Sequence, residues 1–289
     1  MSRANRRRFI WTLSYLVGIA VLGVVAPRIS PYDPLLLNPD HVLAPPSAAH
    51  WLGTDEFGRD ILSRLLYGIR PSLTIAVAST LLASAPGLYF GVLAGYYRGA
   101  VEQLIMRTAD TILCFPPIIL ALAVVGFLGP SIPNLVLVIG LLYIPTFVRL
   151  AYASTLDVTQ IEYITVARAI GVPHSRVIAR HVVPNIMSPI LVQCGVTVAA
   201  AILLESGLSF LGLGVQPPSP SWGQMIGAAK AYLAESGTYV LWPSIAIAMT
   251  ILVLNQLTDT LRDHLDPRTR RGGQLTRPSK EPANGGRNP

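Results

Sequence analysis

The sequence predicts an all-α, polytopic membrane protein with six transmembrane helices, and three observations lead to this fold class. Of the 289 residues, 52% are hydrophobic and only 13% are charged, whereas a soluble domain carries about 25% charged residues. The mean hydropathy is +0.51. The apolar residues also gather into stretches without any Asp, Glu, Lys or Arg, and these stretches approach or exceed the ~20 residues that a helix needs to cross a bilayer.

These uncharged stretches give the helices in order, at residues 9–26, 72–97, 111–148, 182–204 and 237–258. The third stretch is long enough for two crossings. Its break is predicted at Gly129-Pro130, because glycine and proline disfavour helix continuation and form turns. The first stretch follows four arginines and also fits a secretory signal peptide. It is longer than the apolar region of such a peptide, and Pro27 would lie at the cleavage site, so we interpret it as a membrane anchor.

The basic residues predict the orientation of the chain. If the N-terminus is cytoplasmic, 17 of the 22 Lys and Arg residues fall on the cytoplasmic side, as the positive-inside rule requires. Both termini are therefore expected in the cytoplasm. The chain then divides into a cytoplasmic N-terminus with the first helix (1–30), an extracytoplasmic segment (31–70), a five-helix core (71–260) and a cytoplasmic, largely disordered tail (261–289). In the extracytoplasmic segment, Arg59, Asp60 and Arg64 either face an extracytoplasmic partner protein or form a structural pair, and the pairing of Asp60 with Arg64 as i, i+4 neighbours is favoured.

Several function classes find no support in the sequence. The uncharged stretches hold no acid or base, although ion pumps and proton-coupled carriers usually carry intramembrane charges. Neither lysine lies in a phosphate-binding loop, and the five histidines form no metal-binding motif. Cys114 and Cys194 lie in apolar stretches outside any cysteine motif and are predicted to be buried thiols. We therefore expect no catalytic residue, no metal site, no ATP hydrolysis by this chain and no nucleic-acid partner.

The cytoplasmic loop over residues 157–184 lies between the fourth and fifth predicted spans. Thr159 and Glu162 fit a capping box that begins a short helix, and Gly171 fits the left-handed position that ends one. Pro173 then opens a second helix that leads to the membrane. An apolar stripe at helical spacing runs along the first helix, formed by Tyr163, Val166, Ala167 and Ile170. The stripe either packs on the protein's own helices or forms a docking surface for another subunit.

Four motifs resemble those of ABC importer permeases. The loop motif Glu162-Tyr163-x-x-x-Ala167-Arg168-Ala169-x-Gly171, with Pro184 downstream, resembles the EAA loop of that family. Three more resemble the C-type subunits of dipeptide and oligopeptide permeases: His50-Trp51-Leu52-Gly53-Thr54-Asp55-x-x-Gly58-Arg59-Asp60-x-x-Ser63-Arg64, then Gly207-Leu208-Ser209-Phe210-Leu211-Gly212-Leu213-Gly214 running to Trp222-Gly223, then Leu261-Arg262-Asp263-His264-Leu265-Asp266-Pro267. Together, in this order, they cover nearly the whole chain except the tail.

The resemblance implies a type I ABC importer core preceded by an N-terminal anchor helix, in the inner membrane of a bacterium. The implied partners are a second homologous permease, two ATP-binding subunits, an extracytoplasmic solute-binding protein and the lipid membrane. ATP and Mg²⁺ would bind to the ATP-binding subunits, and this chain would hold no cofactor. The loop helix would be the coupling helix that docks on the ATPase, through Glu162, Tyr163, Val166, Ala167, Arg168, Ala169, Gly171 and Pro184.

The resemblance also implies a solute and an outer contact. The solute would be a dipeptide or oligopeptide, delivered by the binding protein and moved by alternating access; a nickel or metal-chelate importer has the same architecture. A second amphipathic helix carries Trp222, Met225 and Ile226, and it either lies at the membrane interface as packing or faces the binding protein. A channel or a lipid-embedded enzyme remains a third interpretation, distinguished by conductance or reaction without an ATPase partner.

Overall fold

The computed structural model describes residues 3–265, and within that range the regular secondary structure is helical. A π-helical turn at Ile178–Val182 joins α7 to α8, and short 3₁₀ helices lie at Pro39–His41 and Lys230–Tyr232. The first five residues of the predicted tail, 261–265, belong to α10 and are helical, which corrects that boundary, and the rest of the predicted tail lies outside the described residues. The α-helices are α1 (Arg3–Ile29), α2 (Ile61–Tyr97), α3 (Gly99–Leu113), α4 (Pro117–Leu128), α5 (Ile132–Thr159), α6 (Glu162–Ala169), α7 (His174–Val177), α8 (Val183–Phe210), α9 (Trp222–Ala229) and α10 (Gly237–Leu265).

Six crossings match the prediction if α3 and α4 are counted as one broken span. Five other segments are each long and apolar enough to cross a membrane: Arg7–Ile29, Ile61–Tyr97, Ile132–Thr159, His174–Phe210 and Gly237–His264. The second predicted span begins earlier, at Ile61, and the one predicted at 182–204 extends over His174–Phe210. The third predicted span is the one that is broken. It begins earlier, at Gly99, and it is bent by 86° between α3 and α4.

Two consecutive prolines cause this bend. Pro117 disfavours the helical conformation at the residue before it, and Pro116 accordingly has an extended ψ of 126°. Neither proline has an N–H with which to continue the hydrogen bonds of α3. Cys114 is exposed at the bend, which corrects the prediction of a buried thiol. Cys194 in α8 is only partly buried.

The turn between α4 and α5 lies where the sequence places it. Gly129 takes a left-handed φ of 84°, which glycine adopts without steric cost. The Ser131 side chain caps α5 by accepting from the Asn134 backbone N–H, and the Asn134 side chain donates to the carbonyls of Leu128 and Gly129 at 3.0 and 2.8 Å. This short turn makes α4 and α5 neighbours.

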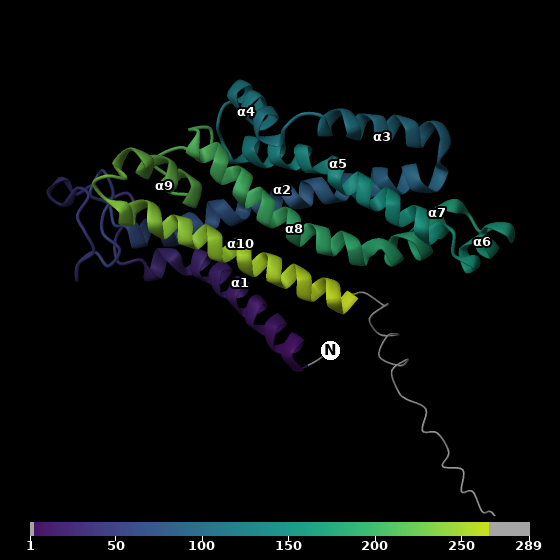
Figure 1. The fold of residues 1–289 in the computed structure, drawn as a ribbon, viewed down its shortest axis with the longest axis horizontal. Helices are drawn as coiled ribbons and strands as arrows, with labels where there is room; N and C mark the ends of the chain where they lie inside the picture. The colour runs from purple at the N-terminus through teal and green to yellow at the C-terminus, as the bar shows by residue number, and fades with distance from the viewer. Residues whose placement is uncertain (1–2, 266–289) are drawn as a thin grey trace, which may run out of the picture.

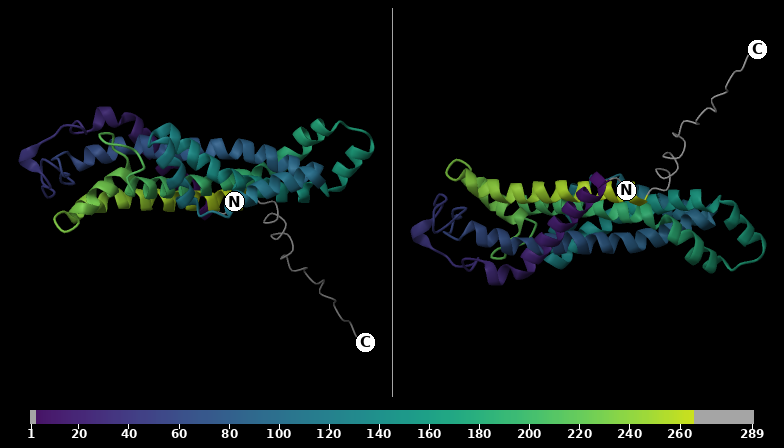
Figure 2. Two further views of the ribbon diagram at one scale, coloured as in Figure 1. Left: turned by 90° about the horizontal axis from the view of Figure 1, so that it is seen from above. Right: turned by 90° about the horizontal axis from the view of Figure 1, so that it is seen from below.

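The helices form an elongated bundle with α2, α5 and α8 at its centre (Figure 1). α1 and α10 lie along one side of these helices, and α3 and α4 lie along the other side. α6 and α7 project at one end of the bundle. α9 and the segment between α1 and α2 lie at the opposite end, as the views from above and below also show (Figure 2).

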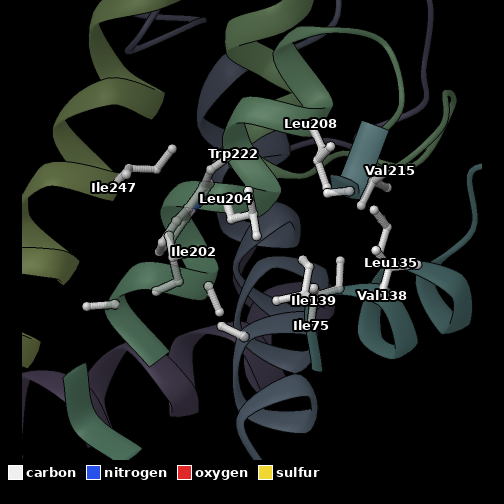
Figure 3. Close-up of a cluster of buried hydrophobic side chains, with 14 of the residues drawn as sticks. Ile75, Leu135, Val138, Ile139, Ile202, Leu204, Leu208, Val215, Trp222 and Ile247 are labelled. Atoms are coloured by element: carbon white, nitrogen blue, oxygen red, sulfur yellow. The ribbon is translucent and has the colours of Figure 1, made fainter. Parts of the chain in front are cut away.

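The largest apolar cluster joins the central helices to α9. Ile75 of α2, Ile139 of α5 and Ile202 of α8 meet there, and Trp222 reaches in from α9 (Figure 3). Because lipid tails are as apolar as these side chains, close packing holds the helices together within the bilayer.

Glycines allow α2 and α5 to approach closely. Gly87, Gly91 and Gly95 recur every fourth residue and so share one face of α2. A Cβ atom at Gly87 would lie 2.3 Å from the Cβ of Phe147, and one at Gly91 would lie 2.5 Å from the carbonyl oxygen of Val148. These distances are shorter than any van der Waals contact, so only glycine fits. Small residues at a four-residue spacing are a common device for packing membrane helices.

Polar side chains organise the segment before α2. The Asp60 carboxylate caps α2 by accepting from the Ser63 N–H at 2.8 Å, and it also contacts His50 Nδ1 at 2.9 Å. Arg64 lies 3.2 Å from Asp55 Oδ2, and Arg59 donates to the same oxygen at 2.6 Å. The predicted Asp60–Arg64 pair is therefore wrong, because capping takes up the Asp60 carboxylate and Asp55 neutralises Arg64.

Candidate coupling loop and outer face

The start of α6 differs from the predicted capping box. Thr159 belongs to the last turn of α5, where its hydroxyl donates to the Leu156 carbonyl at 3.0 Å. Ile161 occupies the N-cap position of α6 and has no side chain that can cap. Glu162 is instead the first residue of the helix, where a carboxylate is favourable because the N-terminus carries a partial positive charge.

The end of α6 confirms the predicted role of Gly171 in the backbone. Gly171 has a left-handed φ of 81°. The Val172 N–H donates to the Ala167 carbonyl at 3.1 Å, and the Gly171 N–H donates to the Arg168 carbonyl at 3.0 Å. This hydrogen-bond pair is the Schellman motif. Pro173 then begins α7 as its N-cap residue.

The apolar stripe of α6 is largely exposed, which contradicts the interpretation that it packs on the protein's own helices. Ile164 is fully buried and packs with Val177 and Val182. Tyr163, Val166 and Ile170 face outward, with exposed fractions of 46%, 57% and 74%, and Ala167 is half-buried. Among the described residues, nothing covers this face of the helix. An exposed apolar patch of this kind typically marks an interaction site.

Aromatic and polar contacts hold α6 on both sides. The Arg168 guanidinium lies over the ring of Tyr96, with 4.2 Å between its central carbon and the ring centroid. Tyr163 accepts from the Asn185 side chain at 2.9 Å and makes an edge-to-face contact with His181. The helix is therefore fixed to the end of α2 and to the start of α8, while Glu162 and Ala169 remain exposed.

The chain enters α8 through the π-helical turn at Ile178–Val182. Pro184 follows directly in the first turn of α8. Inside a continuous α-helix, a proline removes one hydrogen bond and clashes with the carbonyl four residues earlier. A wider turn at this point accommodates such a residue, which explains how α7, the π turn and α8 run together as one long segment.

The structure of α9, at the outer face, contradicts part of the predicted contact of this helix with a binding protein. Trp222 is only 2% exposed, and its indole N–H donates to the Leu65 carbonyl at 3.1 Å. Met225 is fully buried among Ile61, Ala229 and Tyr239. The prediction that Trp222 and Met225 face a binding protein is therefore wrong, because the chain's own residues cover both side chains. Ile226 is half-buried, and its predicted outer contact stays a prediction.

Sequence reasoning missed one buried acid. Glu205 lies in α8, directly after the uncharged stretch that ends at residue 204, and it is fully buried. One carboxylate oxygen accepts from Ser209 at 2.7 Å and from Ser221 at 3.1 Å, which ties α9 to α8. α8 continues to Phe210, so the spans do contain an acid. The nearby serines in the sequence are the signal that would have indicated its partners.

Comparisons with known proteins agree with this architecture. Residues 87–271 match the family described as "Binding-protein-dependent transport system inner membrane component". The chain is 38% identical over 273 residues to the di/tripeptide transport system permease protein DppC of Pseudomonas aeruginosa (strain UCBPP-PA14), covering 92% of this chain and 90% of the relative. It is 38% identical over 256 residues to the dipeptide transport system permease protein DppC of Alkalihalophilus pseudofirmus, covering 89% and 84% of the two chains.

A third relative and a solved structure extend these comparisons. The chain is 39% identical over 269 residues to the glutathione transport system permease protein GsiD of Pectobacterium atrosepticum, covering 91% of this chain and 89% of the relative. The structure is similar to a chain of the MetNI methionine ABC transporter in an inward-facing conformation, with a TM-score of 0.61 and 15% identity, over 71% of this chain and 98% of the other. This likeness concerns the fold.

Proposed function

Because the chain belongs to the family of binding-protein-dependent transport system inner membrane components, we propose that it is the permease subunit through which an ATP-driven importer takes up dipeptides or oligopeptides. The observation that carries this proposal is the exposed apolar face of α6, which contacts with α2 and α8 hold at one end of the bundle. A permease without an ATPase of its own requires such a surface. ATP and Mg²⁺ bind to the partner subunits, and no cofactor is assigned to this chain.

The coupling step follows from the way α6 is attached. Closure of two ATP-binding subunits around ATP pushes on the face that carries Val166 and Ile170. The displacement passes to α2 through Arg168 and Tyr96, and to α8 through Tyr163 and Asn185. Since these helices run the length of the bundle, their movement opens the opposite end. This chain and a second, homologous permease thereby alternate between inward-open and outward-open states.

The proposed solute comes from the relatives. The three named above are permeases for di- and tripeptides, dipeptides and glutathione, which favours a peptide over Ni²⁺. A solute-binding protein outside the membrane is proposed to deliver the peptide. In this orientation both termini are cytoplasmic, α6 faces the cytoplasm, and the segment between α1 and α2 faces outward.

Reconstitution tests this function directly. The complete complex is placed in proteoliposomes. ATP is enclosed inside, and the solute-binding protein and a radiolabelled dipeptide are added outside. We expect uptake that requires both ATP and the binding protein. Substituting Val166→Asp should abolish uptake and release the ATPase subunits during purification, because a carboxylate cannot be buried at an apolar contact without a partner. Val166→Leu, which keeps the site apolar, should retain both the uptake and the bound ATPase subunits.

A different result would identify another function. Peptide flux without ATP, or an ion conductance by the purified chain alone, would reject the importer in favour of a channel. Uptake of Ni²⁺ with no uptake of peptide would reject the peptide as solute. Retention of the ATPase subunits by Val166→Asp would show that α6 is not their docking surface.

A further inference from the structure

We propose that the folded segment of residues 31–60, between α1 and α2, is the surface on which the solute-binding protein docks. This inference rests on the proposed function, because it uses the outward orientation of that segment and the existence of the partner. It places the contact with the binding protein on this segment and not on α9, where Trp222 and Met225 are buried. Four features of the structure support it.

The first feature is that the segment covers α9. Leu43 and Leu52 pack against the cluster that buries Met225. Arg64 links the two elements, because it donates to the Pro34 carbonyl at 3.2 Å and to the Gln224 side chain at 3.1 Å. A protein that approaches this end of the bundle therefore meets the segment before it meets the apolar residues of α9.

The second feature is that the segment is held in one shape, although its regular secondary structure is limited to the short 3₁₀ helix at Pro39–His41. The Ala44 N–H donates to the Thr54 hydroxyl at 2.8 Å, and the Thr54 hydroxyl in turn donates to the His41 carbonyl. The Leu43 N–H donates to the Asp55 carbonyl at 3.0 Å. Asp55 also accepts from buried Arg59. A surface that is already ordered loses less conformational entropy when a partner binds.

The third feature is the number of large apolar side chains that this ordered segment exposes. Trp51 is 68% exposed, and the other members are Leu36, Leu37, Val42 and Phe57, all between 47% and 60% exposed. The segment lies at the outer ends of the helices (Figures 1 and 2), away from the apolar lengths that lipid chains surround. Lipid contact thus explains the exposed residues of α1 but not these. Aromatic side chains of this kind commonly dominate protein–protein contacts.

The fourth feature is the charge of the segment. Its five acids and one base give a net charge of −4, although the whole chain carries +7. Asp33 and Asp40 are exposed, whereas the one base, Arg59, is buried against Asp55 and Glu56. Such a surface repels anionic lipid headgroups and attracts basic groups. The partner that fits is a soluble protein with an apolar patch bordered by Lys and Arg residues.

Photo-crosslinking in the assembled complex identifies what touches the segment. p-Benzoylphenylalanine is introduced at Trp51, and in a matched control at Phe127, which is highly exposed on α4 at a different part of the bundle. We expect the probe at Trp51 to crosslink to the binding protein that supports uptake, and the probe at Phe127 not to. Adducts from Trp51 with only the second permease or lipid, or no adduct with the binding protein, would overturn the proposal.

Binding affinity supplies the second measurement. The complex in nanodiscs is titrated with the same binding protein, and Trp51→Ala is compared with Trp11→Ala, which removes an even more exposed tryptophan on α1. Trp51→Ala should weaken binding about 10-fold or more, as expected for a central aromatic contact, while Trp11→Ala should have less than about a 2-fold effect. Asp33→Lys with Asp40→Lys should also weaken binding and reduce its dependence on salt.

The two proposals can fail separately. If the variants bind and transport like the wild-type complex, the docking surface is rejected and the importer function stands. If the wild-type complex shows no uptake that depends on ATP and a binding protein, the proposed function is rejected. The unchanged ATPase activity of the Trp51→Ala complex without binding protein shows that this variant is assembled.

Discussion

The guanidinium of Arg168 on α6 lies against the ring of Tyr96 at the end of α2, with 4.2 Å between its central carbon and the ring centroid. Its Nε and Nη2 atoms are buried and have no hydrogen-bond partner among the described residues, so the aromatic face is the main contact of this cation. The Tyr96 hydroxyl in turn contacts His174 Nδ1 at 2.8 Å. α2 is one helix of 37 residues, and this contact therefore joins α6 to an element that runs the length of the bundle.

Removing this cation should uncouple ATP hydrolysis from transport. In Arg168→Gln we expect the number of peptides moved per ATP to fall about 5-fold or more, because a desolvated cation–π contact contributes about 2 kcal/mol. The ATPase subunits should stay bound, since the exposed face of α6 is unchanged. Arg168→Lys should retain part of the coupling. Uptake and phosphate release measured in the same proteoliposomes give the ratio.

Arg176→Gln is the matched control for this prediction. Arg176 is an exposed base in the same loop, on α7, and its loss removes the same charge without touching Tyr96. A coupling ratio in Arg168→Gln that equals that of the wild-type complex would show that the stacked contact transmits nothing. An equal loss in both variants would attribute the effect to charge alone.

Backbone conformation, and not the size of the side chain, should decide which substitutions Gly171 tolerates. A Cβ atom at this position would meet no atom within 4 Å, so crowding is not the constraint. The left-handed φ of 81° is the constraint, and it costs a β-branched residue more than about 1 kcal/mol. We expect Gly171→Val to lose transport at wild-type protein levels, and Gly171→Asn to keep more of it, because asparagine also occurs at this helix end.

Gly126→Val serves as the comparison for Gly171→Val. Gly126 lies on α4, its added Cβ would also meet no atom within 4 Å, and its backbone has no positive φ. The same replacement there should leave uptake nearly unchanged. Full transport by Gly171→Val would mean that the end of α6 does not matter for coupling.

The sequence predicted the crossings well because each depends on local composition. The turn at Gly129 and the end of α6 at Gly171 depend on the conformation of single glycines, and both were predicted correctly. The bend in the third span was missed although Pro116 and Pro117 indicate it. Charge counting uses the absence of Asp, Glu, Lys and Arg, and a proline pair inside an uncharged stretch does not alter that count.

Most contacts between residues that are distant in the chain could not be predicted from the sequence. Arg64 contacts Gln224 from 160 residues away, and no periodicity in either helix indicates that partner. One distant pair did leave a signal. Asp110 and Arg149 border the long uncharged stretch and are about equally far from the turn at Gly129, and the structure joins them in an ion pair of 2.5 Å between α3 and α5. A hairpin with its turn at the centre brings its two ends together.

The burial of Trp222 was missed for a related reason. Helical spacing of apolar residues shows that one face of α9 is covered, but it does not show what covers it. The covering elements are α8 and α10, which neighbour α9 in the chain, together with α2 and residues 31–60, which are distant in the sequence. For α6, too, the spacing of the apolar residues could not show whether their face is buried or exposed. The same spacing occurs there on a face that is exposed.

Accessibility of introduced cysteines should confirm the orientation. In a background of Cys114→Ser and Cys194→Ala, the exposed residues Ser47, Ser219 and Ser175 are replaced one at a time by cysteine. The distribution of Lys and Arg predicts that Ser47→Cys and Ser219→Cys react with a membrane-impermeant maleimide in intact cells, and that Ser175→Cys reacts only after lysis. Labelling of Ser175→Cys from outside would reverse the orientation and with it the roles of α6 and of residues 31–60.

The contact between α2 and α5 should be sensitive to a single methyl group. A Cβ atom at Gly91 would lie 2.5 Å from the Val148 carbonyl oxygen and 2.6 Å from the Ala151 Cβ. Neither the Val148 carbonyl group nor the Ala151 methyl group can turn away as a long, flexible side chain can, so Gly91→Ala forces the two helices apart. Overpacking of this kind costs about 1–3 kcal/mol, although alanine favours a helix over glycine by about 1 kcal/mol.

Thermal unfolding of the detergent-solubilised complex measures the net effect, and Gly18→Ala is its control. Gly18 lies in α1, and a Cβ atom there would meet nothing within 4 Å, so Gly18→Ala gains helix propensity without crowding. We expect a lower unfolding temperature for Gly91→Ala and an equal or higher one for Gly18→Ala. Two variants that shift in the same direction would show that propensity outweighs packing, and that the glycines at positions 87, 91 and 95 do not set the distance between α2 and α5.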